Sequence, residues 1–206
     1  MSTRSRSIDI DAPCGRHLTY RDLIQCGETQ QRTGIQNTPE VLETYAALKA
    51  LAQEILDPVI DQFGPITLTY GFCSAELAKH VAHGIAPCID QHASHELNRK
   101  GNPICSRLGA AADFSIADFS MTFVAAWIAF NTKFDRLYFY GQHRPLHVSV
   151  GPDYNRQIVK IHTSDDGRRI PKVVKNWNDF FDTNVINQVM STPASYRVCP
   201  PSRYVF

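Results

Sequence analysis

The sequence lacks any apolar run long enough to span a bilayer, so we expect no membrane segment. Residues 1–16 contain no apolar stretch like that of a signal peptide, which predicts a cytoplasmic protein. The net charge is only +1 at pH 7, so the charge indicates neither a nucleic-acid partner nor a membrane surface. The six cysteines form no C-x-x-C pair, and in a cytosolic protein we expect all of them to be reduced thiols.

What is present favours a folded domain. The chain has 206 residues, of which 43% are hydrophobic, and these values suit one domain with a substantial core. Residues 1–16 are polar and predict a loose arm. Residues 17–152 form the expected main domain, and residues 153–206 an extension packed on the same domain. The locally basic stretch around Arg168, Arg169, Lys172 and Lys175 is interpreted as a solvated loop.

The most strongly predicted element is a helix over Thr38–Phe63. Thr38 suits the N-cap and Pro39 the first helical position, Pro58 is expected to kink the last turn, and Gly64 follows the end. The other expected helices are Ser74–His83, Phe119–Asn131 behind an Asp118 cap, and Asn176–Met190. The expected strands are Ile66–Tyr70, Ala111–Ile116, Arg136–Phe139, Leu146–Val150 and Gln157–His162, of which the third and fourth form a hairpin. Helices packed on one side of a small, mostly antiparallel sheet predict an α+β fold.

Three residues in this framework form a candidate zinc site. His92 lies in the run Asp90-Gln91-His92, Asp113 ends the run Gly109-Ala110-Ala111-Ala112-Asp113, and His147 lies on a predicted strand. Two histidines and one carboxylate can bind one Zn²⁺ and leave its fourth position to water. Each residue also has an ordinary interpretation: His92 as a surface loop residue, Asp113 as a cap and His147 as a strand residue turned to solvent.

The order of several motifs resembles a known family. The passage Leu51–Thr69, which leads from the long helix into a strand, resembles the zinc D-Ala-D-Ala carboxypeptidases, a family with the hedgehog/DD-peptidase fold that includes phage endolysins. The other matching segments are Leu18–Leu23, Asn37–Pro39, Asp90–His92, Gly109–Asp113, Phe134–Tyr140 and Pro145–Ser149. A polar insert separates the third and fourth of these, and the resemblance covers about residues 18–150.

The resemblance implies a fold, a metal and an activity. It makes His92, Asp113 and His147 the zinc ligands of a metallopeptidase-like hydrolase. A zinc-bound water would then cleave an amide or peptide-like bond in a small peptide-like or other small-molecule substrate. Because the insert makes the spacing ambiguous, His95 is an alternative ligand to His92, and the preceding Gln91 favours His92.

The sequence departs from the family at two positions. Tyr140 stands where the family has its Glu general base, and Cys73 stands where it has an Arg. A tyrosine with a pKa near 10 cannot take a proton from the zinc water at neutral pH, although it can donate a hydrogen bond to an oxyanion. Replacement bases would come from the insert, with His95 and Glu96, or from the loop before His147. That loop supplies His143, which is narrowly preferred as the base, and Arg144, which would stabilise an oxyanion.

Three functions are therefore considered. The first is a zinc hydrolase with a non-standard general base. The second is a zinc-binding module of this fold that no longer catalyses a reaction. The third is a zinc enzyme that acts on a nucleotide or a small metabolite. The loss of the family Arg argues against recognition of a free C-terminal carboxylate, and the polar insert favours a substrate-facing loop.

Overall fold

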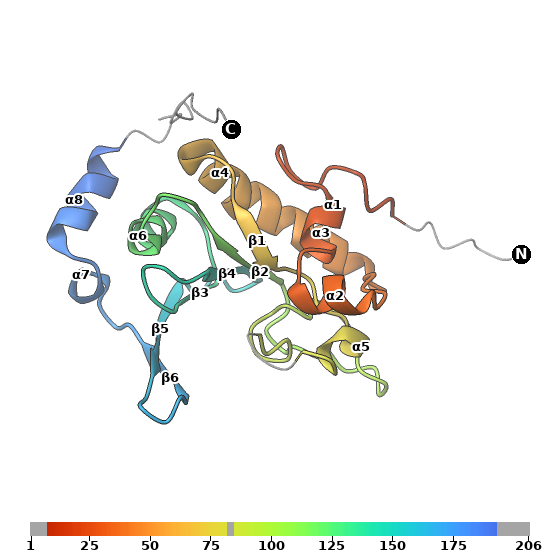
Figure 1. Cartoon of the computed structure of the whole chain (residues 1–206). Coiled ribbons are helices and arrows are strands. Elements are labelled where there is room, and N and C mark those ends of the chain that lie inside the picture. Colours follow the sequence, from red (N-terminus) through yellow and green to blue (C-terminus); the bar gives the residue numbers. More distant parts are fainter. Residues whose placement is uncertain (1–7, 82–84, 193–206) are drawn as a thin grey trace, which may run out of the picture.

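The computed structural model describes residues 8–81 and 85–192 of the chain (Figure 1). Cys199 and the end of the predicted Ser74–His83 helix lie outside these residues, and within them that helix covers only Ala75–Ala78. The helices are α1 (Tyr20–Ile24), α2 (Glu28–Thr33), α3 (Leu42–Leu51), the π-helical turn η1 (Ala52–Leu56), α4 (Asp57–Phe63), α5 (Ala75–Ala78), α6 (Met121–Asn131), α7 (Trp177–Phe180) and α8 (Thr183–Ser191). The strands are β1 (Thr67–Tyr70), β2 (Ala110–Ser115), β3 (Arg136–Phe139), β4 (Leu146–Val150), β5 (Gln157–Thr163) and β6 (Arg169–Val173). This is an α+β fold.

The strands form one mixed sheet in the order β1-β2-β4-β3-β5-β6. All neighbouring pairs are antiparallel except β3 and β5, which are parallel. Strands β3 and β4 form the expected hairpin. Because side chains alternate along a strand, one face of β2 and β4 is apolar and belongs to the core. The core residues of that face are Ala110, Ala112, Phe114, Leu146, Val148 and Val150. The opposite face of the same two strands carries Asp113 and His147, so the candidate site lies on the side away from the core.

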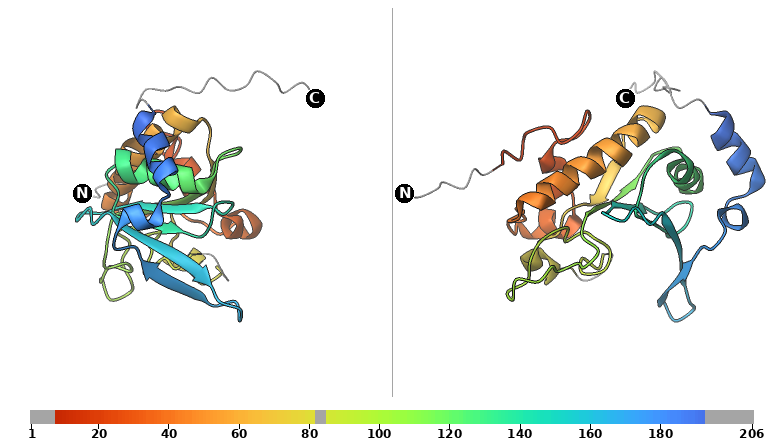
Figure 2. Two further views of the ribbon diagram at one scale, coloured as in Figure 1. Left: turned by 90° about the vertical axis from the view of Figure 1, so that its left-hand side faces the viewer. Right: turned by 180° about the vertical axis from the view of Figure 1, so that it is seen from behind.

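Helices cover the apolar face. In the right-hand view of Figure 2, helices α4, α6 and α8 lie along the same side of the strands, with α6 between α4 and α8. The long predicted helix runs from Leu42 to Phe63 through η1. Pro58 has no backbone N–H and therefore removes one hydrogen bond from the helix. The helix departs from regular α-helical geometry at the π-helical turn directly before α4.

The expected helix start at Thr38 is wrong, because the N-cap is Val41. The backbone N–H groups of Glu40 and Val41 donate to the carboxylate of Glu96, so this distant side chain sets the start of α3. The hydroxyl of Thr44 donates to the same carboxylate at 2.8 Å. A partner more than fifty residues away replaces the local cap that the sequence predicts.

Two other helix boundaries also differ from the sequence-based predictions. Helix α6 is capped by Ser120, whereas Asp118 has a positive φ of 64° and precedes the cap. The predicted helix over residues 176–190 is divided into α7 and α8, because Asp182 has non-helical backbone angles and its side chain accepts the N–H of Asn184.

Both ends of the described chain pack on the main domain. Residues 8–16 are not a loose arm: Cys14 is fully buried, and the N–H of Arg16 donates to the buried carboxylate of Asp57. In the C-terminal part, β5 joins the sheet, and Phe181 and Val189 belong to the same core. Strand β5, Phe181 and Val189 therefore belong to the same sheet and core as the preceding part of the chain.

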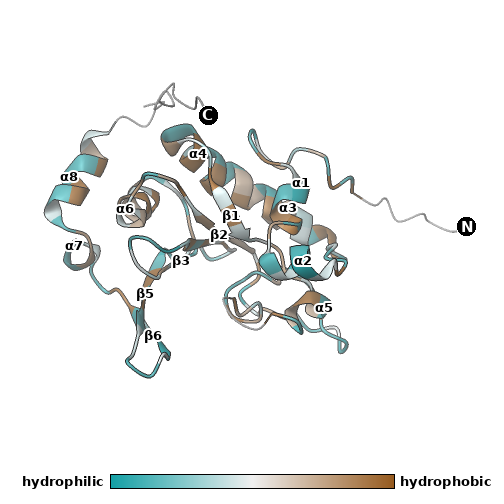
Figure 3. Cartoon of the chain, viewed as in Figure 1, coloured by the Kyte–Doolittle hydropathy of each residue, from teal (hydrophilic) through white to brown (hydrophobic). Residues whose placement is uncertain are grey.

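Strands β5 and β6 form a hairpin that projects from the body of the molecule (Figure 1). The sequence did not predict β6, whose residues are all exposed. Figure 3 shows the turn of this hairpin as hydrophilic and strand β2 as hydrophobic. Within residues 8–81 and 85–192, every helix is too short or too polar to cross a membrane.

Candidate metal centre

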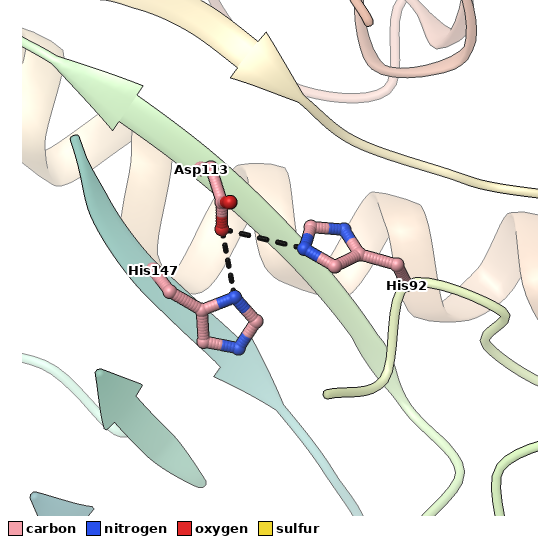
Figure 4. A group of neighbouring side chains, drawn as sticks. All are labelled: His92, Asp113 and His147. Carbon is pink, nitrogen blue, oxygen red and sulfur yellow. Dashed lines mark hydrogen bonds and ion pairs between the residues drawn. The ribbon is translucent and has the colours of Figure 1, made fainter. Parts of the chain in front are cut away.

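The structure brings His92, Asp113 and His147 together in one buried group (Figure 4). Asp113 on β2 and His147 on β4 are direct cross-strand partners. The Nδ1 atom of His147 lies 2.7 Å from Oδ1 of Asp113. The Nε2 atom of His92 lies 3.3 Å from the same carboxylate oxygen. Two imidazole nitrogens thus approach one carboxylate oxygen.

The loop that carries His92 is fixed to the sheet by the preceding residue. Gln91 has a positive φ of 70° and a fully buried side chain. Its amide group donates to the carbonyl oxygens of Leu108 and Val150 at 2.8 and 3.1 Å. Its Oε1 atom accepts a hydrogen bond from the Ser149 hydroxyl at 2.7 Å. Gln91 therefore spans the gap between the loop and β4 and directs His92 toward the site.

A glycine allows this close approach between the loop and the sheet. Gly109 has φ +83°, and a Cβ atom at this position would lie 1.9 Å from the carbonyl oxygen of Val150. No other residue fits there without movement of the backbone. The motif that begins with Gly109 therefore has a structural explanation that is independent of the metal.

The geometry of the group suits a metal ion. One ligand atom from each residue can be chosen such that all three lie within 4.8 Å of one another. With zinc–ligand bonds of about 2 Å, ligand atoms in a tetrahedral site lie about 3.3 Å apart. The contact between His92 and Asp113 already has this length, whereas His147 would have to move about 0.6 Å away from the carboxylate.

The tautomer of His92 is also suited to metal binding. Its Nδ1 atom lies 2.6 Å from the carbonyl oxygen of Gly71, to which it donates. This leaves Nε2 as the lone-pair nitrogen that faces Asp113. Nε2 is buried and has no hydrogen bond of good geometry among the described residues. The buried group can therefore bind a metal ion.

Electrostatics favour a positive charge at this position. Burial opposes the charged form of His92, but the negative charges of Asp90 and Asp113 outweigh this effect and raise the His92 pKa to about 9. Burial likewise opposes ionisation of Asp113, yet the two histidines hold the Asp113 pKa well below its usual range. The ionised carboxylate therefore attracts either a proton on His92 or a metal ion in place of that proton.

His147 is held from a second side by Tyr138. The two rings are stacked with their centroids 4.6 Å apart and an interplanar angle of 18°. The Tyr138 hydroxyl accepts a hydrogen bond from Arg107 at 2.8 Å, so the insert before β2 supports this stack. Sequence reasoning missed Tyr138, although its position opposite His147 follows from the β3–β4 pairing.

A cavity of about 170 Å³ opens beside Asp113. Its lining residues are Thr69, Tyr70, Asp113, Tyr140, Arg144, Pro145 and Arg169. The structure thus brings two of the predicted site residues, Tyr140 and Arg144, to the candidate centre. Burial, together with the charges of Asp113 and Asp90, raises the pKa of Tyr140 far above its usual range. The phenol keeps its proton and can act only as a hydrogen-bond donor to an anion.

The three candidate bases do not line this cavity. His143 is exposed, and its Nε2 atom lies 2.9 Å from Nε2 of Gln142. It lines a different cavity, at the Ser115 end of β2. The Nε2 atom of His95 accepts the N–H of Gly109 at 3.2 Å, so His95 also does not replace His92 in the three-residue group. The carboxylate of Glu96 binds the N-terminus of α3, as described above. These three residues are close to the candidate ligands in sequence, but their side chains do not line the cavity beside Asp113.

Cys73, at the position where the resemblance implies an Arg, is a buried thiol whose Sγ lies 3.7 Å from the carbonyl oxygen of Ser74. Burial and the charge of Asp90 raise its pKa to about 12, so it stays neutral and cannot bind an anion. In the described part of the chain all five cysteines are free thiols. Cys73 therefore cannot provide the positive charge that the resemblance implies at this position.

Sequence reasoning also missed Arg169, which reaches the cavity from β6. Its guanidinium lies over the Tyr140 ring, 5.4 Å from the centroid. The basic stretch that contains it is not a loop throughout, because Arg169–Val173 form β6, which pairs with β5 in a hairpin. The pairing of β5 with the distant β3 then carries this hairpin to the site. A larger hollow of about 420 Å³ lies by β5, β6 and α7, and no residue of the metal-binding group lines it.

Comparisons of this chain with protein-family models, curated proteins and solved structures found no match.

Proposed function

We propose that this protein is a zinc-dependent hydrolase that cleaves an amide or peptide-like bond and has the hedgehog/DD-peptidase fold. The observation that carries the proposal is the convergence of His92 Nε2, His147 Nδ1 and Asp113 Oδ1 at the edge of a small cavity. Two neutral imidazoles and one carboxylate are a typical donor set for catalytic zinc. A bound zinc ion would supply a Lewis acid and a water of lowered pKa.

The protein's own groups support hydrolysis in two ways. Tyr140 is half-buried and protonated, so it can donate a hydrogen bond to a carbonyl oxygen that becomes negative during the reaction. Arg144, which lines the same cavity, adds positive charge near that oxygen. Together they provide electrostatic stabilisation of an oxyanion in a partly dehydrated site.

A second candidate, a zinc-binding module without catalysis, is favoured by one observation. Among the described residues that line the cavity, Asp113 is the one carboxylate and there is no histidine, so no base other than the proposed metal ligand is present. Loss of a general base lowers rates by about 10²–10⁴. The missing base therefore predicts either no turnover, as in a binding module, or hydrolysis at a low rate.

The test is the hydrolysis of a set of short peptides, including D-Ala-D-Ala-terminated ones, by zinc-loaded protein, with products identified by mass spectrometry. We expect cleavage that stops when zinc is removed by a chelator and in the His147→Ala variant. Tyr140→Phe should lower kcat by about 10²–10³ while the zinc content is unchanged.

A different result would favour the binding module over the hydrolase. In that case the protein binds zinc stoichiometrically through His147 but cleaves no peptide in the set. A third pattern, cleavage that persists in both the chelator-treated protein and the His147→Ala variant, would contradict a role for the metal in the reaction.

A further inference from the structure

We propose that Arg144 and Arg169 form a subsite that binds a small oxyanion group of the substrate, either a carboxylate or a phosphate. This inference rests on the proposed function, since the subsite would orient a substrate at the same centre. Arg169 lies outside residues 18–150, the segment that resembles the carboxypeptidases. Nothing in that resemblance therefore assigns the subsite.

The charge of the cavity favours an anion. Two arginines and one aspartate are the charged residues among those that line the cavity beside Asp113, so the cavity carries a net charge of +1. A divalent ion bound to Asp113 and the two histidines would raise this net charge to +3. A partly enclosed cavity with this charge attracts anions more strongly than the exposed surface does, because the surrounding protein screens charge less than water.

The arrangement of the two arginines also suits a small anion. The Arg169 guanidinium lies over the Tyr140 ring, which limits its orientations. An arginine presents a planar set of N–H donors that matches both oxygens of a carboxylate or phosphate. Arg144 approaches from the loop between β3 and β4, whereas Arg169 approaches from β6. A small anion between them would receive hydrogen bonds from two independent elements.

The volume of the cavity limits the size of the group that it can hold. The cavity volume of about 170 Å³ is smaller than the roughly 300 Å³ at which typical ligand pockets begin. It has room for one end of a substrate, such as a terminal residue with its charged group. The resemblance implies an Arg at position 73, where this chain has Cys73. In the proposed subsite, Arg144 and Arg169 provide positive charge from other parts of the chain.

The experiment is a titration of zinc-free protein with sodium acetate, and separately with inorganic phosphate, at constant ionic strength. Binding is followed by the NMR signals of the arginine Nε–H groups. We expect saturable shifts at Arg144 and Arg169, with dissociation constants about tenfold or more higher in Arg144→Ala and Arg169→Ala. Tighter binding of acetate would identify a carboxylate as the natural group, and tighter binding of phosphate a phosphate.

Two variants serve as controls. Arg168→Ala removes the neighbouring arginine, which is exposed and paired with Asp166, and it should bind both anions as the wild type does. Arg169→Lys keeps the charge but not the planar donor set, and should bind with intermediate affinity. Circular dichroism verifies that each variant is folded.

The outcomes separate the subsite from the metal. The inference is overturned if the wild type shows no saturable shifts at these arginines, or if the Arg144→Ala and Arg169→Ala variants bind like Arg168→Ala, even when zinc binds stoichiometrically. Conversely, anion binding that depends on both arginines in a protein that takes up no zinc would leave the subsite standing and remove the proposed hydrolase.

Discussion

The side chain of Gln91 provides a quantitative test of how the metal centre is built. Gln91 is fully buried, and its amide group makes hydrogen bonds to Leu108, Val150 and Ser149. Gln91→Ala would leave two carbonyl oxygens and one hydroxyl without this partner. Each unsatisfied buried group costs about 1–3 kcal/mol, and partial rehydration reduces the sum. We therefore expect the free energy of unfolding of zinc-free protein to fall by about 3 kcal/mol.

The same substitution should weaken zinc binding. Gln91 directly precedes His92 and connects its loop to β4, so the imidazole loses its fixed position when the amide is removed. Loss of an outer-shell support typically costs 10–100-fold in metal affinity. Urea denaturation measures the stability, and competition with a chromophoric zinc chelator measures the affinity.

Gln31→Ala is the matched control. The Gln31 amide also lies near two backbone carbonyls, those of Gln25 and Cys26, but at 3.4 and 3.5 Å and at an exposed position. Its removal should change stability by no more than about 0.5 kcal/mol. If Gln91→Ala behaves like Gln31→Ala in both assays, the proposed role of Gln91 is refuted.

Two further predictions concern ionisable groups. The His92 pKa is raised to about 9 in the folded zinc-free protein, so protonated His92 should stabilise the fold fully below about pH 6.5. This contribution to the free energy of unfolding, about 3 kcal/mol, should disappear as the pH rises through 9. Urea denaturation at several pH values measures the loss, which should be absent in His92→Asn. Glu96→Gln should lower stability by about 1–2 kcal/mol without changing zinc content, because Glu96 binds the start of α3. The exposed Glu76→Gln is its control, and equal effects of the two glutamine variants would contradict that role.

The parts of the site that were predictable from sequence are those set by local patterns. Alternation along β2 and β4 separates apolar core residues from Asp113 and His147, and the Gln91-His92 pair indicates which histidine of the insert faces them. The order of motifs predicts that the three residues form one group, and in the structure they lie together. The strands of the β3–β4 hairpin were likewise predictable, because short connections favour antiparallel neighbours.

The parts that were not predictable depend on contacts between distant segments. Arg169 reaches the cavity because β5 pairs in parallel with β3 and β6 then folds back, a topology that no local pattern indicates. The sequence places Glu96 near the candidate metal site, but its partners are the first N–H groups before α3. His143 is close to His147 in sequence, yet its side chain lines a different cavity.

The central claim is that His92, Asp113 and His147 bind zinc, and zinc content per chain tests it most directly. Protein purified without chelator and equilibrated with zinc should hold one tightly bound ion per chain. His147→Ala should lose most of it, whereas His80→Ala, which removes an exposed histidine outside the group, should keep it. Wild-type protein that neither carries zinc nor takes it up, or a His147→Ala variant that retains the full content, would contradict the account.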